Sequence, residues 1–426
     1  MQNSRRIISK KAAFAGVSGT IFQWYDFSLF GFFAPIIAKQ FFPGTSTIIS
    51  LMSTFGVFAV GFLLAPLGAV FFGHIGDRYG RKRVLSLSIL LMTIPTTLIG
   101  FLPSYQSIGI LAPILLTLFR LIQGFVASAE FAGSAIFLLE HAPEGRQCFY
   151  SSLTSSSYSI GMIIGSLTAS LVTMHFMPEW AWRLPFILSL CAGLIISYLR
   201  TQVCETPIFD VQKCQKHYPM LRAFSENPRS VATTIGIAAF AGIISYGSYV
   251  YMVTYLHATA GLSLSTAIVL VSLALLIDAI TEPFIAMLAD KIGKKVMMRV
   301  GSILMILLVT PIFMGLSSGS IALALSSIVT LTLLIAITFS PSNALMGLSF
   351  PSSQRCSGFG VSFNIGITLF GGTAPLVLAY LVHYHNRIIG PVSYYLFAIL
   401  IGLVSLYFSR EYSGNIRADL DANNKA

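Results

Sequence analysis

Apolar residues occur along the whole chain in long runs, and short polar or charged segments separate one run from the next. A helix needs about 20 mostly apolar residues to cross the hydrocarbon core of a bilayer. The runs have about this length, which is too long for the alternating strands of an outer-membrane barrel. Twelve of them can be placed, near residues 12–38, 49–74, 84–102, 108–139, 150–174, 183–201, 231–257, 265–289, 296–316, 320–346, 357–382 and 390–409. The pattern predicts an all-α membrane protein with twelve transmembrane helices.

The composition agrees with a membrane protein. Of 426 residues, 55% are hydrophobic and only 10% are charged, whereas soluble domains carry about 25% charged residues. A basic segment precedes the first run, as in a signal peptide, but the run is too long and no cleavage site follows it, so we expect an uncleaved helix in the inner membrane. The five cysteines are scattered and lack metal-ligand spacing. We expect no metal, no cofactor and no enzyme, because no phosphate-binding loop or other catalytic signature occurs.

The positive charges are distributed unequally between the two sides of the predicted membrane. With the N-terminus placed in the cytoplasm, 22 of the 26 Lys and Arg residues fall on the cytoplasmic side and three fall outside, while Arg120 lies within the fourth run. This asymmetry predicts that both termini are cytoplasmic and that the number of helices is even. Because the cations serve the topology, the net charge of +11 is not a sign of nucleic-acid binding.

A loop motif recurs at half-chain spacing. Asp77, in the loop after the second run, matches Asp290, in the loop after the eighth. Gly80 matches Gly293 in the same way, and two or three cations follow each glycine. Such a repeat indicates two homologous halves with a substrate path between them, near the membrane midplane. We expect two pseudo-symmetric six-helix bundles joined by a cytoplasmic loop, with boundaries at 1–202, 203–230 and 231–426.

Two motifs give the chain a resemblance to a known family. GDRYGRKR, at residues 76–83, is close to the loop motif of the major facilitator superfamily, and residues 289–295 carry a degenerate copy. RLIQG, at residues 120–124, resembles the Arg-x-x-Gln-Gly signature of the superfamily's fourth helix. The resemblance implies a transporter whose two halves give access to each side of the membrane in turn.

Other segments are similar to the metabolite:proton symporter subgroup, which includes proline/betaine, α-ketoglutarate, citrate and shikimate permeases. These segments span nearly the whole chain: QWYDFSLFG (23–31), RLIQGFVASAEFAGSA (120–135), HAPEGRQCFYSS (141–152), WRLPF (182–186), ETPIF (205–209) and FNIGITLFGGTAPL (363–376). The resemblance implies proton symport that imports a small polar metabolite, either a zwitterion or an organic acid.

Three positions depart from the subgroup's pattern. Gln23 stands where the subgroup usually has Glu, and Ala65 stands where it usually has Arg before a proline. Its Gly-Gly-Glu pattern in the fourth helix reads Ser128-Ala129-Glu130 here. An uncoupled facilitator or an exporter of the same fold is therefore an alternative. A non-transporting membrane sensor is a further alternative, which the short tails disfavour.

Charged side chains within the predicted helices are candidates for function, because each costs about 2.5–3.5 kcal/mol in hydrocarbon on insertion scales. Asp26 and Glu130 are the proton-coupling candidates, because a carboxylate in a low-dielectric site can bind and release a proton. A structural hydrogen bond to a neighbouring helix is the alternative for Asp26. Arg120 can bind a substrate carboxylate or pair with Asp26.

Further residues are expected to line a substrate cavity. Asp278 occupies the position in the second half that matches Ala65 in the first. If acids line the cavity, its negative field favours a cationic or zwitterionic substrate over a dicarboxylate. The complete set of cavity candidates is Gln23, Tyr25, Arg120, Asp278, Tyr249 and Asn364.

The repeated loop is expected to form a cytoplasmic gate. Its turn requires glycine, and Asp77 can bind arginines or a helix N-terminus of the other half. The residues of this motif are Gly73, Asp77, Arg78, Gly80, Arg81, Lys82 and Asp290. The expected partners are a small-molecule substrate, protons and the lipid bilayer, with no nucleic acid, and we expect the chain to function as a monomer.

Overall fold

The computed structural model describes residues 10–44, 47–172, 177–201 and 224–412. Every regular element within these ranges is a helix, as the apolar runs predict. The elements of the first half are α1 (Lys10–Phe32), α2 (Ala34–Phe41), α3 (Thr47–Leu63), α4 (Ala65–Tyr79), α5 (Arg81–Phe101), α6 (Tyr105–Ile108), α7 (Leu111–His141), α8 (Gln147–Val172), η1 (Ala181–Arg183) and α9 (Leu184–Thr201).

The second half contains three short π-helical segments in addition to its α-helices. Its elements are α12 (Pro228–Ser245), η2 (Tyr246–Tyr251), α13 (Met252–Thr254), η3 (Tyr255–Thr259), α14 (Leu264–Ile292), α15 (Lys294–Leu316), α16 (Ile321–Phe339), α17 (Ser342–Leu348), η4 (Ser352–Gln354), α18 (Arg355–Gly366), η5 (Ile367–Gly371), α19 (Ala374–Tyr384) and α20 (Ile389–Phe408). The π-helical segments η2, η3 and η5 interrupt otherwise continuous helices, and such interruptions occur frequently at functional sites.

Ten helical segments within the described ranges are long and apolar enough to cross a membrane. Helices α1 and α8 coincide with the first and fifth predicted runs but are not among these ten. Both contain many small and polar residues, and they pack closely against each other. A Cβ atom added to Gly161 of α8 would lie 2.4 Å from the carbonyl oxygen of Ile21 in α1. The small residues of α8 thus allow close contact with α1, as is common where membrane helices pack together.

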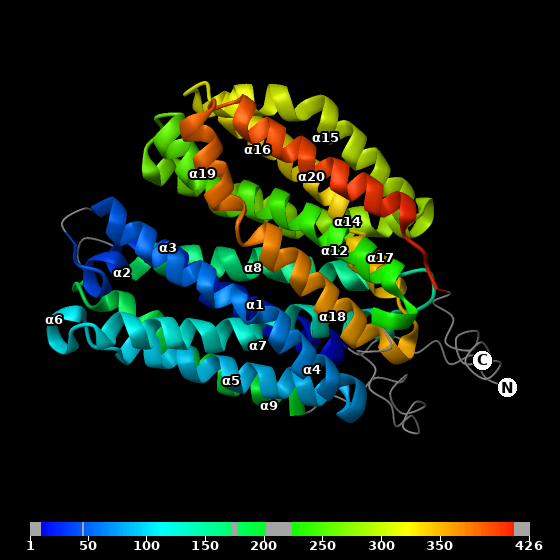
Figure 1. Ribbon diagram of the computed structural model, residues 1–426, viewed down its shortest axis with the longest axis horizontal. Helices are drawn as coiled ribbons and strands as arrows, with labels where there is room; N and C mark the ends of the chain where they lie inside the picture. The colour runs from blue at the N-terminus through cyan, green and yellow to red at the C-terminus, as the bar shows by residue number, and fades with distance from the viewer. Residues whose placement is uncertain (1–9, 45–46, 173–176, 202–223, 413–426) are drawn as a thin grey trace.

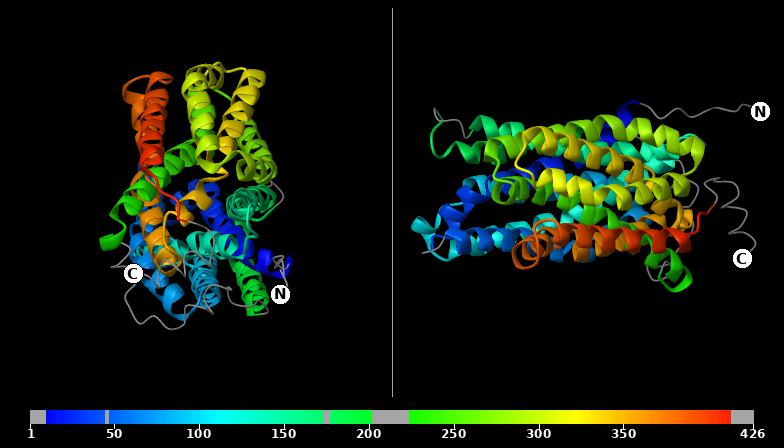
Figure 2. Two further views of the ribbon diagram at one scale, coloured as in Figure 1. Left: turned by 90° about the vertical axis from the view of Figure 1, so that its right-hand side faces the viewer. Right: turned by 90° about the horizontal axis from the view of Figure 1, so that it is seen from above.

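The helices of the first half and those of the second half form two groups that lie side by side (Figure 1, Figure 2). Helix α8 packs against α14 across the boundary between the groups, and α4 packs against α18. A Cβ atom on Gly73 of α4 would lie 3.2 Å from the Cα atom of Ser357 in α18. The two halves therefore touch closely near the end of the molecule where α4 and α14 finish.

Gly80 and Gly293 confirm that the repeated loops share a backbone conformation. Gly80 separates α4 from α5 with φ of 106°, and Gly293 separates α14 from α15 with φ of 111°. Residues with a side chain rarely adopt these angles, so the tight turn requires glycine at both places. The loop motif that recurs in the sequence is thus a recurring turn in the structure.

Candidate functional site

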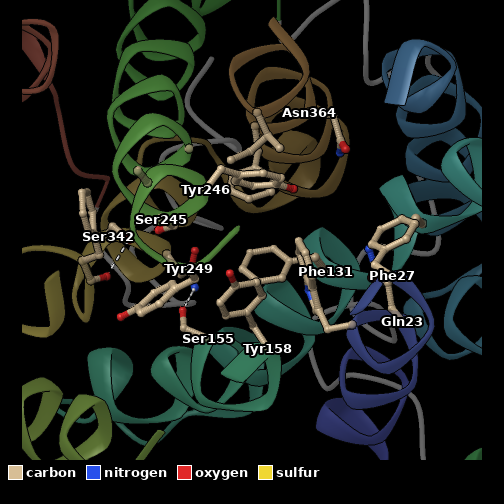
Figure 3. Close-up of a pocket in the computed structure, with 18 of the residues that line it drawn as sticks. Gln23, Phe27, Phe131, Ser155, Tyr158, Ser245, Tyr246, Tyr249, Ser342 and Asn364 are labelled. Atoms are coloured by element: carbon tan, nitrogen blue, oxygen red, sulfur yellow. Dashed lines mark hydrogen bonds between the residues drawn. The ribbon is translucent and has the colours of Figure 1, made fainter. Parts of the chain in front are cut away.

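A cavity with a volume of about 110 Å³ lies between the two groups of helices. Helices α1, α7 and α8 of the first half contribute to its wall, and so do α12, α14 and α18 of the second half (Figure 3). Four residues that the sequence analysis selected line this cavity: Gln23, Tyr249, Asp278 and Asn364. Ala65, which stands where the subgroup usually has Arg, lines it as well.

Aromatic rings form much of the cavity wall. The Trp24 ring lies edge-on to the Tyr158 ring, with centroids 4.3 Å apart, and 6.1 Å from the Tyr246 ring. The Tyr158 ring lies 6.2 Å from the ring of Tyr249. These rings come from α1, α8 and η2, so they join the two halves around one space. Trp24 and Tyr158 were not among the cavity candidates, because a single sequence does not show which face of a helix points toward the cavity.

Asp278 and Glu282 are the acidic groups of the cavity. They lie one turn apart on α14, with side chains 4% and 3% exposed. Ser159 of α8 donates a hydrogen bond of 2.7 Å to Asp278 Oδ2. Asp278 Oδ1 and Glu282 Oε2 have no hydrogen-bond partner among the described residues. Two buried carboxylates thus leave acceptor atoms unused at the cavity.

Asn364 and Asn343 bind across the boundary between the halves. The Asn364 amide nitrogen donates to the Ser128 carbonyl oxygen at 3.1 Å and to the Gly360 carbonyl oxygen at 2.8 Å. The Asn343 amide nitrogen donates to Ser155 Oγ at 2.9 Å (Figure 3). These polar contacts close the cavity wall where α7 and α8 meet the second half.

A second polar cluster lies behind the aromatic wall rather than in it. Arg120 Nη1 lies 3.3 Å from Asp26 Oδ2, and both side chains are at most 1% exposed. Gln123 Nε2 lies 2.9 Å from Asp26 Oδ2 and 2.7 Å from Thr96 Oγ1. A substrate carboxylate and Asp26 were the two expected partners of Arg120. The structure shows the pairing with Asp26. Arg120 is not among the residues that line the cavity.

Phe27 connects this ion pair to the cavity. The Arg120 guanidinium lies 3.9 Å from the ring centroid of Phe30 and 5.9 Å from that of Phe27. Phe27 itself lines the cavity. A change in the position of Arg120 would therefore shift Phe27, and with it part of the cavity wall.

Gly124 explains the glycine that ends the Arg-x-x-Gln-Gly motif. A Cβ atom on Gly124 would lie 1.5 Å from the carbonyl oxygen of Gly61 in α3. The backbones of α3 and α7 can therefore touch only because this position has no side chain. The contact holds the adjacent Gln123 and the preceding turn of α7, which carries Arg120, in place.

Glu130 lies in a separate buried ion pair with Arg200, near the C-terminal end of α9. Arg200 Nη1 lies 3.0 Å from Glu130 Oε2, and its Nη2 pairs with Oε1. Ser88 Oγ donates to Glu130 Oε2 at 2.6 Å. Arg200 is one of the 22 Lys and Arg residues assigned to the cytoplasmic side from the sequence, and the structure buries its side chain to 2% exposure. Glu130, like Asp26, does not line the cavity.

Tyr25 also points away from the cavity. Its hydroxyl donates a hydrogen bond of 3.3 Å to the Pro185 carbonyl oxygen in α9. Tyr25 thus contacts α9 of its own half and is not among the residues that line the cavity.

The expected gate is described in part. The side chains of Asp77, Arg78 and Arg81 lie outside the described part of the structure. Lys82 is partly buried in the first turn of α5. Asp290, the repeat partner of Asp77, accepts hydrogen bonds from the backbone N–H groups of Cys148 and Phe149, at 2.8 and 3.0 Å.

The contact of Asp290 caps a helix of the other half. Cys148 and Phe149 lie in the first turn of α8, where the backbone N–H groups have no partner within the helix. The negative charge of Asp290 also complements the positive end of the α8 dipole. The sequence analysis predicted this kind of contact for Asp77, and in the structure Asp290 makes it.

Comparisons with known proteins place this site in context. The family model described as Major Facilitator Superfamily matches residues 16–375 and 237–419. The glycine betaine/proline/ectoine/pipecolic acid transporter OusA of Dickeya dadantii is 32% identical over 419 residues, covering 94% of this chain and 83% of that protein. The shikimate transporter of Escherichia coli is 32% identical, covering 92% of each chain. The alpha-ketoglutarate permease of the same organism is 34% identical, covering 84% of each.

Solved structures with much lower sequence identity to this chain share its fold. The proton:xylose symporter XylE, bound to 6-bromo-6-deoxy-D-glucose, superimposes with a TM-score of 0.79 at 15% identity, covering 97% of this chain and 98% of that one. A partially occluded, inward-open structure of XylE from E. coli superimposes with a TM-score of 0.71 at 14% identity, covering 93% and 96%.

Proposed function

Because the chain belongs to the Major Facilitator Superfamily, we propose that it is a secondary transporter that imports a small polar metabolite together with protons. The relatives named above are transporters, and one structural neighbour is named as a proton symporter. The multi-pass helical architecture supports the same class. No ATP is required in this proposal, because a proton gradient supplies the free energy.

The proposal includes a topology. The ten candidate spans together with α1 and α8 make twelve helices, in two pseudo-symmetric six-helix bundles at 1–202 and 231–426, with 203–230 as the cytoplasmic connection. Both termini lie in the cytoplasm, and the chain works as a monomer in the inner membrane. The 22 to 3 distribution of cations supports this orientation.

The observation that carries the proposal is the buried ion pair between Asp26 and Arg120. Two charges held without water are strongly coupled, and neutralising one of them leaves the other unpaired at a high cost in free energy. A proton on Asp26 would release Arg120 from the pair. Because Arg120 contacts Phe27, the state of Asp26 is linked to the shape of the cavity.

Glu130 is the second proton-coupling candidate in this proposal. Its pairing with Arg200 joins α7 to the end of α9 and gives it the same chemistry as Asp26. Asp26 is the stronger candidate because it lies one side chain from the cavity, whereas Glu130 packs against Gly19, Ser88 and Arg200.

Substrate-induced pH change tests the proposal. Purified protein is screened by thermal shift against betaines, amino acids and organic acids, because a ligand that binds only the folded state raises the unfolding temperature. A compound that binds is then added to vesicles that contain the protein. Symport predicts that the external medium becomes alkaline as the compound enters. Entry of the labelled compound without any pH change would contradict symport.

An uncoupled facilitator or an exporter is the second candidate. Gln23 favours it, because an ionisable residue of the subgroup is replaced by an amide in the cavity wall. Uptake that follows only the substrate gradient, with no response to an imposed pH gradient, would support a facilitator.

A further inference from the structure

The charged side chains among the described residues of the cavity wall are all acidic. Among the described residues that line it, Asp278 and Glu282 have charged side chains and no Lys or Arg is present. Two buried arginines of the first half are already paired with acids of their own half. Arg120 pairs with Asp26, and Arg200 pairs with Glu130. The cavity therefore offers two carboxylates and no cation of its own to balance them.

Buried carboxylates without a counter-charge are costly. An isolated ionised carboxylate in a low-dielectric site must be paired, hydrogen-bonded or neutralised. Ser159 satisfies one oxygen of Asp278, while Asp278 Oδ1 and Glu282 Oε2 have no partner among the described residues. These unused acceptors, on a pair of like charges one helical turn apart, point to a cationic group that comes from a ligand.

The aromatic wall fits the same ligand. Trp24, Tyr158 and Tyr249 line the same cavity as the acidic pair and form a connected row of rings. Tyr158 and Tyr249 each lie close enough to Asp278 to interact with it electrostatically. The face of an aromatic ring attracts a cation by about 0.5–2 kcal/mol. An alkylammonium group suits both features, because its positive charge offsets the carboxylates and its alkyl carbons pack against the rings.

We propose that the cavity selects an organic monocation, an alkylammonium group without a carboxylate, which lies between Asp278, Glu282 and the rings of Trp24, Tyr158 and Tyr249. A zwitterion would bring a carboxylate into a cavity whose described lining already holds two acids and has Ala65 at the place of the subgroup's arginine. The amides of Asn343 and Asn364 are engaged with Ser155 and with Ser128 and Gly360. This inference rests on the proposed function for the direction of transport. Its test measures binding alone and does not depend on that direction.

Binding of three compounds of the same shape provides the test. Radiolabelled choline is the probe for the purified, full-length protein in detergent at neutral pH. Glycine betaine adds a carboxylate to the trimethylammonium group, and 3,3-dimethyl-1-butanol replaces the charged nitrogen of choline with carbon. We expect saturable choline binding, with glycine betaine and the neutral alcohol competing at least about tenfold more weakly, a difference of about 1.4 kcal/mol.

Charge-neutralising variants identify the site. Glu282→Gln and Asp278→Asn should each weaken choline binding by about tenfold or more, while Glu411→Gln, which removes an acid from a surface pair with Lys294, should leave it unchanged. Thermal unfolding checks that each variant is folded, and Glu282→Gln alone suffices if Asp278→Asn is unstable.

Three results would overturn the inference: no saturable binding of choline, glycine betaine binding as tightly as choline, or unchanged choline affinity in a folded Glu282→Gln variant. Because no pH gradient is present, these outcomes are independent of proton coupling. Choline binding without gradient-driven uptake would instead leave the site standing and count against symport.

Discussion

Arg120 and Asp26 meet 3.3 Å apart in the interior of the first half, although 94 residues separate them in the chain. The guanidinium lies 5.9 Å from the ring centroid of Phe27, which lines the cavity, and Gln123 donates a hydrogen bond to Asp26. The pair thus combines two properties that proton coupling needs, a dry carboxylate and a mechanical connection to the substrate cavity.

A double-mutant cycle measures this coupling. Asp26→Asn and Arg120→Gln should each destabilise the protein by about 3–5 kcal/mol, because each leaves one buried charge without its partner. The double variant should recover most of that loss. Unfolding by denaturant or heat in detergent gives the three values. If the two single losses simply add in the double variant, the residues do not form a coupled pair.

The backbone contact between Gly124 and Gly61 predicts a strong effect of one methyl group. Gly124→Ala should destabilise the protein by about 1–3 kcal/mol or more, because the methyl group meets a carbonyl oxygen that cannot rotate away. Gly56→Ala is the matched control in the neighbouring helix, since a Cβ atom there meets no atom within 4 Å. The control should remain within about 1 kcal/mol of the natural protein. Equal unfolding temperatures for both variants would contradict the close approach of α3 and α7.

The contact of Asp290 with the first turn of α8, called the latch below, should be broken by one substitution. Cys148 is fully buried beneath its contact with Asp290, so it reports on that contact when the other four cysteines are replaced by serine. Asp290→Ala should speed maleimide labelling of Cys148 by about tenfold or more, because a hydrogen bond to a charged group contributes about 1.5–3 kcal/mol.

The control for the latch is Glu411→Gln, which breaks an exposed salt bridge to Lys294 in the neighbouring helix α15. It should leave the labelling rate unchanged, since exposed pairs contribute little. An Asp290→Ala variant that labels no faster than this control would show that the capping contact does not hold the two halves together.

Much of the fold follows from the sequence because lipid imposes it. Long apolar runs have few alternatives to helices in a bilayer, since every backbone polar group needs an internal partner. The repeated turn after Asp77 and Asp290 could also be predicted from the sequence, because its backbone conformation requires glycine at Gly80 and Gly293. Helix α8 carries small and polar residues on its buried face, and the contact at Gly161 shows how closely it packs against α1.

The site was only partly predictable, because one sequence does not reveal how each helix is rotated. Gln23 and Tyr25 are two residues apart on α1, yet Gln23 lines the cavity and Tyr25 bonds to Pro185. Pairs between distant helices are hidden as well. Arg200 lies at the very end of an apolar run and was counted with the cytoplasmic cations, and only the fold brings it to Glu130, 70 residues away.

The most direct measurement of the central claim compares gradient-driven uptake with exchange in the Asp26→Asn variant. Vesicles are given an alkaline interior, and accumulation of a labelled substrate is followed beside exchange of labelled for unlabelled substrate without a gradient. We predict that Asp26→Asn abolishes accumulation and keeps exchange, because the carrier can still change conformation but no longer binds the proton. Full gradient-driven accumulation in both Asp26→Asn and Glu130→Gln would contradict the assignment of proton coupling to these buried carboxylates.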